Sequence, residues 1–64
     1  MFSIGDRVRL VKSSSGYDPG AQGVVMTMPQ PDVLQVDIDK DENDNPIQPP
    51  DPLPPLSDDY FKKV

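Results

Sequence analysis

The densest run of chemically active side chains is the segment DIDKDENDNP, which carries five acidic residues and two asparagines. Carboxylate and amide oxygens are the ligands that a hard cation such as calcium prefers. Positions 1, 3, 5, 7 and 9 of an EF-hand-like spacing fall on Asp37, Asp39, Asp41, Asn43 and Asn45. One hypothesis for this segment is therefore a weak calcium-binding loop at 37–45.

Two positions of the calcium template carry the wrong residue. Position 6, where the loop needs glycine for a sharp turn, is Glu42, and position 12, where a bidentate glutamate is needed, is Gln48. No helical pattern flanks the segment on either side. We therefore favour a solvated acidic loop, and we expect neither a metal site nor a cofactor.

The distribution of charge favours a protein partner. The net charge is −5, and residues 29–59 hold nine acidic residues against a single lysine. An acidic surface repels nucleic acid, whose phosphates reward clustered lysine and arginine, and it attracts a basic protein. Tyrosine is a favoured interface anchor. We therefore expect the tyrosine of the first loop to bind the partner together with the acidic loop at 37–44. The predicted partner-binding residues are Tyr17, Asp18, Asp37, Asp39, Asp41, Glu42 and Asp44.

A rival hypothesis uses the basic residues near the N-terminus. Arg7 and Arg9 point to the same side of a predicted strand, and with Lys12 they could contact the phosphates of RNA or a ribosome. Nucleic-acid sites normally add stacking aromatic side chains, which this stripe does not have. Pairing of the two arginines with acids of a neighbouring strand, such as Asp37 and Asp39, is the favoured use.

Several functional classes lack the residues that they need. Without cysteine or histidine the chain offers no disulfide and no zinc or iron–sulfur ligands. The serines of SSSG have no base near them in sequence, and Asp58 with Asp59 could exchange protons only inside a sheltered cleft. We expect no enzymatic activity. The start MFSIGDRVRL contains no long apolar run, so neither a signal peptide nor a membrane span is predicted, and a cytoplasmic location is expected.

Three segments alternate between apolar and polar residues, namely IGDRVRLV, GVVMTM and VLQVDID. A period of two predicts half-buried strands. In the first, Ile4 is expected to share the inner face with Val8 and Leu10. In the third, Leu34, Val36 and Ile38 are expected to face the core. Nine prolines in 64 residues work against helices, and the length predicts one small domain over residues 1–64.

The connections between these strands carry clear turn signals. The first loop, KSSSGYDPGAQG, is polar and contains an Asp-Pro-Gly turn. The acidic and proline-rich residues 40–55 are expected to form an extended, rigid loop that Leu53 and Leu56 fasten across the core. Their P-x-x-P spacing leaves a ligand motif for SH3 or WW domains as an alternative. In LSDDYFKKV, Ser57 is expected to cap a tight turn before a last strand, with Phe61 or Tyr60 covering the core.

The order GDRVRLV, PGAQGVV and LQVDID resembles the opening of KOW-type and related SH3-like domains. It is also similar to the small SH3-like accessory subunits of photosynthetic and ferredoxin-linked complexes, whose last strand follows a short acidic turn as LSDDYFKKV does. The resemblance implies an all-β, SH3-like small barrel of about five short antiparallel strands with a proline-rich loop before the last strand. It implies little about function. The first loop has no basic residue after Lys12, unlike KOW domains that contact RNA.

Overall fold

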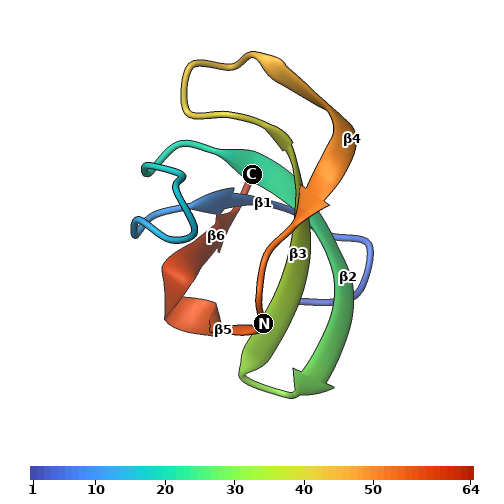
Figure 1. Cartoon of the computed structure of the whole chain (residues 1–64). Coiled ribbons are helices and arrows are strands. Elements are labelled where there is room, and N and C mark those ends of the chain that lie inside the picture. Colours follow the sequence, from blue (N-terminus) through green and yellow to red (C-terminus); the bar gives the residue numbers. More distant parts are fainter.

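A computed structural model describes all residues 1–64 as an antiparallel sheet of six strands with one 3-10 turn and no α-helix. The strands run in the order β4-β3-β2-β1-β6, and the short β5 pairs with β3 (Figure 1). The all-β prediction is confirmed, with one strand more than the expected five. The elements are β1 (Arg7–Leu10), β2 (Gln22–Gln30), β3 (Val33–Lys40), β4 (Pro46–Pro52), β5 (Leu56–Ser57), η1 (Asp58–Tyr60) and β6 (Phe61–Lys63).

The core lies on one face of this sheet, where the alternating apolar residues meet. Leu34, Val36 and Ile38 of β3 are buried, as the sequence predicts, and their polar neighbours are only half-buried. The prediction for Ile4 is wrong, because its side chain is 66% exposed. A turn closed by the hydrogen bond from the amide of Asp6 to the carbonyl of Ser3 precedes the strand, which begins only at Arg7. The nine core residues are Val8, Leu10, Ala21, Val25, Leu34, Val36, Ile38, Leu53 and Phe61.

Gly23 lets β2 and β3 approach each other closely. A Cβ at this position would collide with the carbonyl group of Asp37 and lie 2.9 Å from the Cγ1 of Val36. The register of the two strands also shifts between Gln22 and Gly23, as at a β-bulge. Glycine is required here by the close contact between neighbouring strands.

The proline-rich residues do not all form the loop that the sequence predicts at 40–55. Residues 46–52 form β4, an edge strand that pairs with β3. Lys40 pairs with Pro46 and Ile38 pairs with Asp51, so five steps along β4 oppose only two steps along β3. Proline has no amide proton for a ladder and is tolerated at a sheet edge or a bulge. Residues 47–50 therefore bulge away from β3, and we call them the proline bow. The Gln48–Pro49 peptide bond in the bow is cis.

The last residues connect one side of the sheet to the other. After β4, the amide of Leu53 donates to the carbonyl of Val36 at 2.9 Å, and its side chain is buried, which confirms the predicted fastening for Leu53. Leu56 packs against the core but is only partly buried. β5 then pairs with β3, and β6 pairs with β1. The expected tight turn is the 3-10 turn η1, although the Ser57 side chain makes no capping hydrogen bond. Phe61 covers the core as predicted. The sheet itself is not closed, because β4 and β6 end it.

No helix in the structure has the length and the apolar character that a membrane crossing requires.

Candidate functional site

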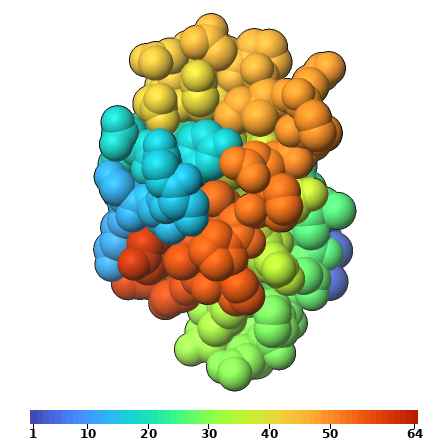
Figure 2. Space-filling model, in the orientation of Figure 1, coloured from blue at the N-terminus to red at the C-terminus, as the bar shows by residue number.

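The first loop and the β3–β4 loop, residues 41–45, are joined at one end of the molecule. The backbone amide of Asp18 donates to the Oε1 of Glu42 at 3.1 Å. Gly20 lies against the backbone of Glu42 with a φ of +112°, so a side chain there would be strained. Figure 2 shows the first loop in cyan, the β3–β4 loop in yellow and β4 in orange as one continuous surface. The fold thus brings Tyr17, Asp18 and Glu42, which the sequence predicts as partner-binding residues, to the same end of the molecule.

Tyr17 links the first loop to β4. Its hydroxyl donates a hydrogen bond of 2.6 Å to the Oδ2 of Asp51. This bond, together with partial burial of the ring, raises the pKa of Tyr17 to about 12. Two backbone hydrogen bonds between Tyr17 and Ser14 fix the loop on the other side. The backbone and the hydroxyl of Tyr17 are therefore both held in place.

Three exposed or half-buried carboxylates belong to the segments that meet at this tyrosine: Asp51 accepts the hydrogen bond of its hydroxyl, Asp18 follows it in the chain, and Glu42 accepts a hydrogen bond from the amide of Asp18. Asp18, Glu42 and Asp51 come from three separate segments, and none of them has a basic partner. We call these three residues, with Tyr17, the acidic ridge. Asp51 was missed by the sequence reasoning. An isolated charged residue between prolines, as in PPDP, is the signal that could have revealed it.

Two of the acids that the sequence predicts as partner-binding residues make hydrogen bonds within the fold. Both oxygens of Asp39 accept hydrogen bonds from Arg7, at 2.9 and 3.0 Å, and these bonds lower the pKa of Asp39. The Oδ1 of Asp41 accepts from the backbone amides of Asn43 and Asn45, at 2.8 and 2.9 Å. The bond from Asn45 is the main reason that the pKa of Asp41 is lowered.

The remaining two acids lie apart from the acidic ridge or are partly neutralised. Asp44 sits at a φ of +66° in the β3–β4 loop, and its Oδ1 is 3.5 Å from the Nζ of Lys40. Asp37 belongs to β3, where it pairs with Val24 and with Pro52. No three acidic side chains come together in a way that could hold a metal ion.

The basic stripe of the rival hypothesis is largely neutralised. Arg7 is paired with Asp39, which confirms for this arginine the pairing favoured from the sequence, although β2 lies between the two strands. Its Nε also donates to Gln22 at 3.3 Å. Lys12 forms an ion pair of 2.7 Å with Asp59, which raises the pKa of the lysine. Arg9 has no acidic partner and pairs across the strands with Lys62, which has none either.

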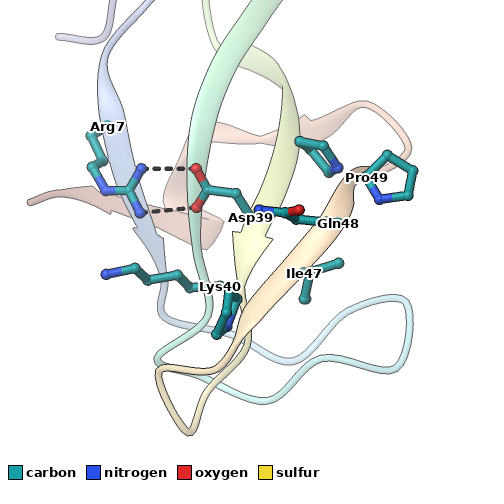
Figure 3. A pocket seen from close by; sticks show the side chains of 8 residues that line it. Arg7, Asp39, Lys40, Ile47, Gln48 and Pro49 are labelled. Atoms are coloured by element: carbon teal, nitrogen blue, oxygen red, sulfur yellow. Dashed lines mark hydrogen bonds and ion pairs between the residues drawn. The ribbon is translucent and has the colours of Figure 1, made fainter.

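A groove that the sequence did not predict lies between the proline bow and the Arg7–Asp39 ion pair (Figure 3). Its volume is about 530 Å³. The groove exists because the proline bow bulges away from β3. The sequence could not predict it, because the register of β4 against β3 cannot be read from a proline-rich segment. The lining residues are Arg7, Asp39, Lys40, Pro46, Ile47, Gln48, Pro49 and Pro50.

No protein-family model matches the chain, and no curated protein or solved structure is significantly similar to it. Function is therefore inferred from the geometry alone.

Proposed function

We propose that this chain is a non-enzymatic binding module that docks on a basic segment of a protein partner through the acidic ridge. The observation that carries the proposal is that three chain segments meet at Tyr17, and that no lysine or arginine forms an ion pair with their carboxylates. Three carboxylates on one surface would steer a lysine- or arginine-rich segment toward it. The tyrosine ring would then provide the apolar anchor that charges alone do not supply.

The ridge is also organised in advance. The hydrogen bonds from Tyr17 to Asp51 and from Asp18 to Glu42 restrict both loops in the free protein. Ordering a flexible loop at an interface costs free energy that a preformed surface avoids. This property supports recognition, because less free energy is spent on ordering the two loops when a partner binds.

We further propose that the fold is an SH3-like small barrel of the accessory-module or KOW-like kind. Three features support this assignment: a long first loop, the β2–β3 hairpin, and a 3-10 turn directly before the last strand. The segment β5–η1–β6 leads from the side of β3 to the side of β1, as the closing segment of a small barrel does.

The proposal is tested by titrating the isotopically labelled chain with a short peptide rich in lysine and arginine. We expect the amide signals of Tyr17, Asp18 and Glu42 to shift, and we expect the affinity to fall as salt is added, because exposed charges are screened. Tyr17→Ala should weaken binding further. Glu42→Gln should do the same, whereas Asp32→Asn is a matched control that removes one charge from the β2–β3 turn at the opposite end (Figure 1).

Binding that is insensitive to salt and unaffected by Tyr17→Ala would remove the proposal. Parallel titrations with short RNA and DNA address the rival function, in which Arg9 and its neighbour Lys62 would add to Arg7 and Lys12. Shifts of the β1 amides with nucleic acid, but none with the basic peptide, would favour that rival. A titration with calcium, followed at residues 37–45, addresses the remaining alternative.

A further inference from the structure

The groove beneath the proline bow has walls of a particular kind. Pro46, Pro49 and Pro50 contribute rigid saturated rings, and Ile47 adds a half-buried aliphatic side chain. The Arg7–Asp39 ion pair lies across from them (Figure 3). A volume of about 530 Å³ falls within the roughly 300–1,000 Å³ that is usual for small-ligand sites.

The charge of the groove is opposite to that of the whole chain. Two cations, Arg7 and Lys40, line it together with a single carboxylate, Asp39, although the net charge of the chain is −5. Arg7 uses three N–H groups, one toward Gln22 and two toward Asp39. A guanidinium has five N–H donors, so two are not used by these contacts. The ammonium of Lys40 lies 3.5 Å from the carboxylate of the exposed Asp44, and its charge also acts on Asp39, whose pKa it helps to lower. The polar chemistry of the groove therefore suits an anion.

The apolar chemistry of the groove suits an aromatic ring. Proline-rich segments are recognised by surfaces lined with aromatic rings, so a surface lined with prolines is complementary to an aromatic group. The guanidinium of Arg7 on the opposite side can also stack on an aromatic face. An aliphatic ligand would satisfy the prolines but would gain nothing from the arginine.

We propose that this groove binds a carboxylate carried next to an aromatic ring. The ring lies between the proline bow and Arg7, and the carboxylate pairs with Lys40. A free aromatic acid has this chemistry, and so does a peptide that ends in an aromatic residue. The site is separate from the acidic ridge, since neither Tyr17 nor the three ridge carboxylates line the groove. It does not depend on the function proposed above.

The test is a titration of the labelled full-length chain with phenylacetate and with a short peptide that ends in phenylalanine. We expect saturable shifts at the amides of Lys40, Ile47 and Gln48. Lys40→Met should lower the affinity about fivefold, as the loss of one exposed ion pair does. Lys62→Met removes an equal charge from β6 and should leave the affinity unchanged. The amide spectrum of each variant without ligand checks that it folds.

Two further probes separate the parts of the proposal. Cyclohexylacetate has the same charge and nearly the same size without an aromatic face, and the amidated peptide lacks the terminal carboxylate. Both should bind more weakly than their parents. Stronger binding of phenylacetate than of the peptide indicates a free acid as the source, and the reverse indicates a chain terminus. Absence of saturable shifts with both parents, equal binding of cyclohexylacetate, or equal effects of Lys40→Met and Lys62→Met would overturn the proposal.

Discussion

At the scale of single residues, Tyr17 connects two parts of the chain that are far apart in sequence. Its hydroxyl donates to Asp51, 34 positions away, at 2.6 Å. A hydrogen bond to a carboxylate is stronger than one between neutral groups, and it favours the protonated phenol. The raised pKa of Tyr17, about 12, follows mainly from that bond.

The titration of Tyr17 should reveal this contact directly. The chain has two tyrosines and no tryptophan, so the Tyr60→Phe variant leaves Tyr17 as the single chromophore that ionises. We expect a tyrosinate absorbance midpoint of about 12, and we expect Asp51→Asn to move it toward the ordinary tyrosine value of 10.0. Because the pKa is raised on folding, the contribution to stability is complete below pH 10.0 and is lost as the pH rises through about 12. Equal midpoints in the two proteins would show that the hydrogen bond is absent in solution.

The roles of the acidic residues could be predicted from the sequence only in part. Pairing between the arginines of the first strand and acids of another strand was the favoured interpretation, and the Arg7–Asp39 pair confirms it for Arg7 but not for Arg9, which has no acidic partner. The bond between Tyr17 and Asp51 could not be foreseen, because it depends on the path of a proline-rich segment. The role of Asp41 as an acceptor for two backbone amides could not be predicted either. Aspartate and asparagine are favoured both in turns and in metal-binding loops, so their presence does not distinguish the two.

At the scale of elements, the path from β4 to β5 depends on one apolar side chain. Leu53 is 2% exposed, while Pro52 before it and Pro54 and Pro55 after it are exposed. Its amide also donates to Val36 of β3. Leu53 therefore fastens the segment that carries both the proline bow and Asp51.

Truncation of Leu53 should be costly for this reason. We expect Leu53→Ala to lower the free energy of unfolding by about 2–5 kcal/mol, as other buried leucines do. The exposed neighbour provides a matched control, and Pro54→Ala should change stability by no more than about 0.5 kcal/mol. Urea unfolding followed by circular dichroism measures both. Equal losses in the two variants would mean that the segment is held by its backbone and not by the buried side chain.

The strands differed in how well the sequence revealed them. β3 was predictable because its residues alternate strictly and its inner face is apolar throughout. β4 was not, because prolines at 46, 49, 50 and 52 are typical of a loop, and only its position at the edge of the sheet permits the pairing with β3. The groove could not be predicted from the sequence either, because it arises from the register of β4 against β3.

At the scale of the whole molecule, acidic side chains fasten segments that are distant in sequence. Asp6 lies 3.4 Å from Lys63, Asp39 pairs with Arg7, and Asp59 pairs with Lys12. A domain of this size has a small core, here nine buried residues, so such contacts matter more than in a large protein. The pKa of each of these carboxylates is lowered: for Asp6 mainly by the backbone amide of Ser3, for Asp39 by Arg7 and for Asp59 by Lys12.

The stability of the chain should therefore fall in acid. The lowered pKa values mean that the unfolded chain binds more protons near pH 3.8, the ordinary pKa of an aspartate, than the folded chain does. The contribution of these carboxylates is present above that pH and is lost as the pH falls through the lower values of the folded state. Urea unfolding between about pH 5 and about pH 3 should show a steadily falling free energy. Asp39→Asn, which cannot ionise, should flatten this dependence.

A free energy of unfolding that rises in acid is also physically possible, so the measurement distinguishes between two electrostatic effects. The net charge of −5 creates repulsion that protonation relieves, and that effect alone would make the fold more stable in acid. We expect the specific contacts to dominate, because each joins groups 2.7 to 3.4 Å apart, whereas diffuse repulsion between exposed charges is screened within about 10 Å at moderate salt. A free energy of unfolding that rises as the pH is lowered, and rises less when salt is added, would show that repulsion wins.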